Sequence, residues 1–155
     1  MTRVCLVGNG DHDLRTELLS RQTAREALAT YELERPYANT VAIETISLGV
    51  AVSFCNDLSW YLARFAEDAL ILEPSVSETE WLSQEFATAI RDGVISPEEH
   101  APHRVVYGVE SDESGTPRLV DPTYTTVTDG TELAYDHRDR DDTLVVRVTE
   151  SEDRP

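Results

Sequence analysis

The residues best placed to do chemistry are Gly8-Asn9-Gly10 and the polar residues that follow them. They lie between an apolar segment and a predicted helix, where dinucleotide-binding folds place a glycine-rich turn whose N–H groups bind a pyrophosphate. Here Asp13 stands at the third glycine position, and Asp11 adds a second carboxylate that opposes an anion. His12, between them, could act as a general base. We interpret Gly8–Asp13 as a structural turn, with a ligand site that includes Gly8 and Gly10 as the alternative.

Metal-binding patterns in the sequence fail on spacing or on the number of ligands. Alternate residues from Asn9 to Asp13 imitate the first ligands of a calcium loop, but Leu14 stands where that loop needs glycine and Ser20 where it needs glutamate. His100 and His103 lie in an acidic connector that contains proline and has no third ligand nearby in the sequence. We therefore predict no metal and no cofactor.

Arg21 and Arg25 lie on the same line of the predicted first helix as Leu14, Leu18 and Leu28. A guanidinium on an apolar face needs a partner, because an unpaired buried charge is costly. One hypothesis is a fork that binds a phosphate or carboxylate ligand. The other is an internal ion pair, or side chains whose stems cover the sheet while their charged ends reach water. We favour the second hypothesis.

The longest amphipathic pattern runs from Gly49 to Leu72 and predicts one helix at the centre of the core. Trp60 breaks this pattern, because it falls on the polar side with Arg64 one turn later. Three explanations are open: a cation–π contact with Arg64, burial under another part of the chain, or an anchor in an interface with a partner or a second copy. We expect burial within the chain, with the interface as the main alternative.

The elements that position these residues begin with a strand at 3–7, a helix from about residue 13 to residue 33 and a strand at 41–48. We expect the two strands to be parallel, as in a right-handed β-α-β unit. Gly8–Asp13 and Ser47–Gly49 would then leave the same edge of the sheet and flank a ligand crevice.

A third helix is predicted from a local signature around Ser77. Ser77 and Glu80 form a capping box, and Val76 and Trp81 occupy the positions of a hydrophobic staple. The helix should end before Gly93, with Arg91 in its last turn.

From residue 103 onward the side chains alternate, which predicts strands at 105–109, 118–128, 133–135 and 144–148. The predicted fold class is α+β: a single-domain sandwich of residues 1–150, with three helices packed on a mixed sheet of about five strands in the order β-α-β-α-α-β-β-β. Residues 151–155 are expected to form a disordered tail.

The charge of the chain indicates where the protein works. Thirty acidic residues stand against thirteen arginines and no lysine, and the formal net charge is −17. In molar salt the screening length falls to about 3 Å, so an acidic surface maintains solubility with little self-repulsion. This balance is typical of proteins from salt-accumulating cells, and we expect molar salt to favour the folded state. Because the arginines are scattered along the sequence, nucleic-acid binding ranks last among the functions considered.

Cys5 and Cys55 are expected to behave as small buried hydrophobes, since two cysteines provide neither a disulfide framework nor a zinc pattern. No segment is apolar for long enough to span a membrane, and the N-terminus becomes acidic too early for a signal peptide. We expect a cytoplasmic protein with reduced thiols.

Three segments of the chain resemble a family of small haloarchaeal proteins of unknown function. They are MTRVCLVGNGDHDLRTELLSRQTAREAL at the N-terminus, NDLSWYLARF in the predicted central helix and DDTLVVRV near the C-terminus. The resemblance covers most of the chain. It implies an intracellular setting in a salt-adapted archaeon, and it carries no activity and no functional residues.

We predict a non-catalytic cytosolic module that binds a protein partner or a second copy of itself, with Trp60 and Arg64 as contact residues. The alternative is a small ligand-binding protein or enzyme that uses the crevice at Gly8–Asp13 and Ser47–Gly49. A concave site with convergent polar groups would favour the alternative, and an exposed apolar patch would favour the binding module.

Overall fold

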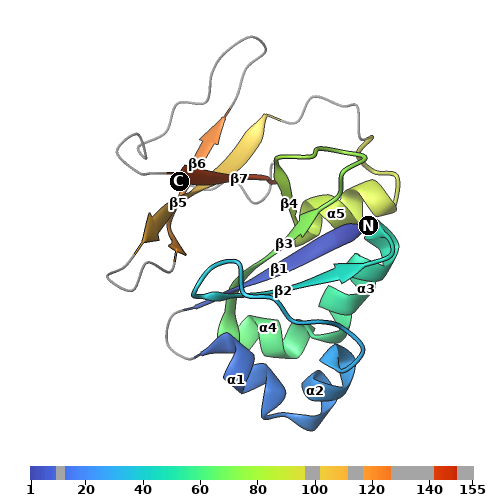
Figure 1. Ribbon diagram of the computed structural model, residues 1–155. Coiled ribbons are helices and arrows are strands. Elements are labelled where there is room, and N and C mark those ends of the chain that lie inside the picture. The colour runs from blue at the N-terminus through green and yellow to red at the C-terminus, as the bar shows by residue number, and fades with distance from the viewer. Residues whose placement is uncertain (10–12, 97–101, 112–116, 127–141, 150–155) are drawn as a thin grey trace.

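The structure is a computed structural model that describes residues 1–9, 13–96, 102–111, 117–126 and 142–149 (Figure 1). These residues form seven strands and five helices, which in chain order are β1 (Thr2–Gly8), α1 (Leu14–Leu19), α2 (Gln22–Leu28), β2 (Thr40–Thr45), α3 (Leu48–Asp57), α4 (Ser59–Phe65), β3 (Ala66–Leu72), β4 (Trp81–Ser83), α5 (Gln84–Arg91), β5 (His103–Ser111), β6 (Pro117–Thr126) and β7 (Asp142–Arg147).

All seven strands belong to one sheet in the order β2-β1-β3-β4-β7-β5-β6. Neighbouring strands are antiparallel except β4 and β7, which run parallel. The predicted α+β class and mixed sheet are confirmed, whereas the expected numbers of five strands and three helices are wrong. Among the described residues, no helix is both long enough and apolar enough to cross a membrane.

β1 is buried on both of its faces. Val4 and Leu6 belong to a core cluster that includes side chains of the helices, and Cys5 and Val7 belong to a second cluster with side chains of β5, β6 and β7. Figure 1 shows the helices on one side of β1, β2 and β3 and the strands β5–β7 on the other. A strand covered on both faces is apolar almost throughout, which explains the unbroken run Val4–Val7.

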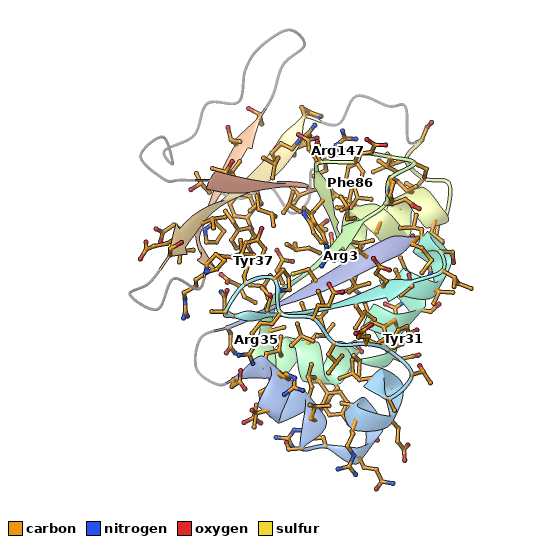
Figure 2. The ribbon with its side chains drawn as sticks, viewed as in Figure 1. Arg3, Tyr31, Arg35, Tyr37, Phe86 and Arg147 are labelled. Carbon is orange, nitrogen blue, oxygen red and sulfur yellow. The ribbon has the colours of Figure 1, made fainter. Side chains whose placement is uncertain are left out.

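The sheet passes from one half to the other through β4, which has only three residues. Glu80, just before β4, accepts a 2.7 Å hydrogen bond from Arg147 Nε and forms a 3.4 Å ion pair with Arg104 Nη2. Figure 2 shows Arg147 near β4, above Phe86. Arg104 and Arg147 face each other on β5 and β7, so the carboxylate of Glu80 offsets the repulsion between two like charges.

β1 and β2 are antiparallel, so the predicted parallel β-α-β unit is wrong. The helix expected over 13–33 is two short helices, α1 and α2, and the chain then returns to the end of β1. There Glu34 pairs with Ala42, and the N–H of Gly8 donates to the carbonyl oxygen of Asn39 at 2.7 Å. β2 therefore starts beside the point where β1 ends, and it runs in the opposite direction.

The helix expected over 49–72 is also wrong in its second half, because α4 ends at Phe65 and Ala66–Leu72 is strand β3. Leu70 and Ile71 are buried in different core clusters, on opposite faces of the sheet. A short apolar run does not distinguish a buried strand from a buried helix by its periodicity. The pairing with β1 on one side and β4 on the other decides in favour of the strand.

The helix expected to begin at Ser77 begins at Gln84 instead. Ser77 Oγ accepts hydrogen bonds from the N–H groups of Thr79 and Glu80, at 3.3 and 3.0 Å, and these close a turn. The side chain of Glu80 binds the two arginines at the sheet junction, so the predicted capping box does not form a helix start.

Ser83 caps α5 in place of Ser77. Its Oγ accepts a hydrogen bond from the N–H of Phe86 at 3.1 Å. The predicted end of this helix is confirmed, because Arg91 lies in its last turn and Gly93 follows with φ of 76°. Such a positive φ favours glycine, which has no Cβ to clash with the backbone.

The strands expected after residue 103 are confirmed where the structure describes them, as β5, β6 and β7. The strand expected at 133–135 and the tail at 151–155 lie outside the described residues.

We predict that Ser83→Ala lowers the free energy of unfolding by about 1 kcal/mol, the usual value of an N-cap. Ser83 is buried, and its removal leaves the N–H of Phe86 without its acceptor. Ser53→Ala is the matched control, because Ser53 is exposed on α3, and it should change the stability by less than about 0.5 kcal/mol. Urea denaturation measures both variants, and equal losses would contradict a cap at Ser83.

Candidate functional site

The two segments expected to flank a crevice lie at opposite ends of β1 and β2. Gly8 ends β1 beside Asn39, whereas Ser47 follows the end of β2 that pairs with Thr2 at the start of β1. The crevice predicted between Gly8–Asp13 and Ser47–Gly49 is therefore wrong, because it required parallel strands with their carboxyl ends at one edge.

Each of these two segments has a structural role of its own. A Cβ on Gly8 would lie 3.2 Å from the carbonyl oxygen of Asn39 and 3.3 Å from Leu14 Cβ, so close packing explains the glycine. Ser47 Oγ accepts a 3.2 Å hydrogen bond from the N–H of Val50 and caps α3. Gly10, Asp11 and His12 lie outside the described residues.

Arg21 and Arg25 have different surroundings. Arg21 is half-buried, its guanidinium lies 4.9 Å from the centre of the Phe65 ring, and its Nη2 is 3.4 Å from the carboxylate of Glu17. Arg25 is exposed in the last turn of α2. For Arg21 the structure thus contains the expected internal ion pair, and no contact in the described part of the chain joins the two arginines in a fork.

Residues with metal-binding or nucleophilic chemistry are dispersed or buried. Cys5 and Cys55 are buried free thiols, and desolvation raises the pKa of each to about 12, so both stay protonated at neutral pH. No group of three or more His, Cys, Asp or Glu within the described ranges is arranged to hold a metal. His103 lies at the start of β5, and His100 falls outside those ranges.

Trp60 is the largest apolar side chain that the described residues leave at the surface. Its exposed fraction is 52%, so the expected burial within the chain is wrong. The guanidinium carbon of Arg64 lies 4.3 Å from the centre of the Trp60 ring, which is the cation–π contact considered among the three explanations. Leu62 and Phe65, on the inner face of α4, pack into the core. The outer face of α4 therefore presents an indole ring with a guanidinium stacked on it.

A groove of about 360 Å³ also borders α4, between this helix, β3 and the start of α5. Ser59 and Ala63 contribute to it from α4, and Leu62, Ala66 and Ala69 supply apolar surface. A second hollow of about 410 Å³ shares Gln84 and Glu85 of α5 with it. We call the outer face of α4 with this groove the α4 surface.

Three acidic residues contribute atoms to the lining of this groove: Glu67, Asp68 and Glu85. Asp68 accepts a 3.2 Å hydrogen bond from the hydroxyl of Tyr107, whose pKa is raised by burial and by the nearby carboxylates, so the phenol remains a donor. The side chain of Glu67 reaches solvent, yet the surrounding atoms raise the pKa of its carboxyl by desolvation. The groove thus combines apolar surface with the acidic residues Glu67 and Glu85, whereas the carboxylate of Asp68 is engaged with Tyr107.

The sequence did not reveal this groove, because the residues that form it were assigned to one continuous helix. Had the helix continued, Arg64 and Glu67 would be neighbours one turn apart and could pair. The extended backbone of Ala66 (φ −112°, ψ 145°) instead directs Glu67 into the groove. The adjacent acids Glu67 and Asp68, within an otherwise apolar segment, were the available signal.

We predict that Glu67→Gln raises the melting temperature at pH 7.5. Because desolvation in the folded protein raises the pKa of this carboxyl above its ordinary value, the folded state releases the proton less readily than the unfolded state. Ionisation therefore costs stability as the pH rises through the folded-state pKa, and the benefit of glutamine should shrink as the pH falls toward 4.5.

The control for this prediction is Glu78→Gln, which removes one exposed charge outside the groove. It corrects for the general relief of repulsion in an acidic protein. Thermal melts from pH 5 to pH 7.5 should show a larger and more pH-dependent gain for Glu67→Gln; identical curves for the two variants would contradict desolvation of Glu67.

Comparison with known proteins places the chain in a family without assigning an activity. No curated protein and no solved structure gives a significant match. A family model matches residues 2–109, from β1 into β5, and these residues include the whole α4 surface. The chain belongs to the family of unknown function DUF5804.

Proposed function

We propose that this protein is a non-catalytic binding module whose contact region is the α4 surface. The observation that carries the proposal is the exposed ring of Trp60, stacked by Arg64, on a helix that also borders a groove with apolar surface. Trp and Arg are the residue types most enriched among those that dominate binding energies in protein interfaces.

An indole ring left in water forgoes the free energy of burial. Burial of a large apolar side chain contributes roughly 2–3 kcal/mol, whereas an exposed cation–π contact such as that of Arg64 contributes about 0.5–1 kcal/mol. The contact with Arg64 thus offsets only part of the exposed apolar area of Trp60. A partner that covers the ring would supply the rest.

The hypothesis of an enzyme or ligand-binding protein loses its main support, because the strand direction removes the crevice on which it depended. The groove beside α4 is hollow and acidic, but Asp68 is already engaged with Tyr107. The nearby indole and guanidinium favour contact with another macromolecule.

We further propose that this binding takes place in the cytoplasm of a salt-accumulating, haloarchaeal cell. The support is the net charge of −17, with thirteen arginines and no lysine. At the short screening length of molar salt, long-range repulsion between acidic proteins is weak. Contacts at van der Waals and hydrogen-bond distance then decide which surfaces associate.

We predict that Ala63→Cys is protected from a maleimide in intact cells. Ala63 is exposed at the groove, and the two natural cysteines are buried, so the new thiol reports on coverage of the α4 surface. Thr23→Cys, exposed on α2, is the control. The Ala63→Cys thiol should react more slowly in cells than in dilute purified protein, while the control should show no such difference.

For each thiol, the rate of reaction in cells is compared with the rate in dilute solution. If this ratio is the same for Ala63→Cys and Thr23→Cys, the α4 surface is not the contact region. The assay needs no prior identification of the partner, because it measures whether the surface is covered. It therefore tests the proposed function whether the covering molecule is another protein or a second copy of this chain.

A further inference from the structure

The α4 surface carries a cation, Arg64, and a carboxylate, Glu67, that do not pair with each other. Within the described part of the chain, neither Arg64 nor Glu67 forms an ion pair. By contrast, Arg3, Arg21 and Arg35 each pair with an acid of the same chain.

The backbone explains why these two side chains stay apart. Arg64 is in the last turn of α4, and its guanidinium is stacked on Trp60. Ala66 then adopts an extended conformation, and Glu67 lines the groove. Stacking uses the flat face of the guanidinium and leaves the N–H groups at its edge able to donate to a carboxylate.

A cation and an anion on one surface make that surface complementary to itself. In a two-fold symmetric interface, residue i of one subunit contacts residue j of the other and the reverse contact follows by symmetry. Two copies facing each other through α4 can therefore make two Arg64–Glu67 contacts. Desolvation disfavours the ionised form of Glu67 in the single chain. The guanidinium of Arg64 from a second copy would favour that ionised form and so offset the desolvation.

We propose that a second copy of this chain docks on the α4 surface, with Arg64 of each copy donating to Glu67 of the partner subunit across a two-fold axis. The inference rests on the proposed function and names the partner. The two Trp60 rings lie near the centre of this interface, where aromatic anchors contribute most to affinity. Molar salt suppresses the repulsion between two acidic chains, while a pair excluded from solvent is screened much less.

Charge reversal at the two positions tests the proposal. In molar KCl, light scattering coupled to size-exclusion chromatography should give the mass of a dimer for the wild type. Arg64→Glu and Glu67→Arg should each weaken the dimer by at least about tenfold, because each places like charges opposite each other. Arg25→Glu and Glu78→Arg, which make the same charge changes at exposed positions elsewhere, should leave the dimer intact.

The decisive experiment mixes the Arg64→Glu and Glu67→Arg proteins. Arg64→Glu protein offers carboxylates at both positions and Glu67→Arg protein offers guanidinium groups at both, so a heterodimer regains two attractive contacts. The mixture should therefore form dimers at a protein concentration at which each variant alone is monomeric. Circular dichroism melts confirm that each variant is folded before its mass is interpreted.

Three results would overturn the inference: a wild-type monomer at high concentration in molar KCl, a dimer that both charge reversals leave intact, or a mixture that stays monomeric. If Ala63→Cys is nevertheless protected in cells, the α4 surface binds a different protein and the proposed function stands. If neither protection nor dimer is found, both proposals fail.

Discussion

The burial of β1 on both faces is the constraint on which the rest of the structure depends. Val4 and Leu6 need cover on one side, and Cys5 and Val7 need it on the other. The helices supply the first layer and β5–β7 supply the second (Figure 1). Since all seven strands belong to one sheet, the sheet has to turn back over itself, and the short strand β4 with the Glu80–Arg147 hydrogen bond stands at that turn.

This arrangement also determines which helix surfaces remain free to bind a partner. The inner sides of α3 and α4 are used to cover β1, β2 and β3, so Leu62 and Phe65 are unavailable. The outer side of α4 has no such role, yet it carries Trp60 and Arg64 in contact. The chain reversal at Ala66 that inserts β3 into the sheet also opens the groove and separates Glu67 from Arg64. The fold thus creates the unpaired charges on which the inferred dimer depends.

Features decided by neighbouring residues could be predicted from the sequence, and features decided by distant partners could not. The apolar run of β1, the existence of strands β5 and β7, and the end of α5 at Gly93 follow from local pattern. The direction of β2 and the strand conformation of Ala66–Leu72 depend on pairing with β1. The periodicity of apolar residues within a segment does not reveal such a pairing. The amphipathic pattern places Trp60 on the polar side of its helix, where it is exposed, but the groove that borders α4 exists only because β3 is a strand.

The central claim is that a second copy of this chain covers the α4 surface, and the fluorescence of Trp60 tests it most directly. A Trp81→Phe variant leaves Trp60 as the single tryptophan, and acrylamide, which is uncharged, probes its exposure in molar KCl. The account predicts efficient quenching at low protein concentration and progressively weaker quenching as the concentration rises and a second copy covers the ring. Quenching that stays equally efficient at every concentration would contradict it.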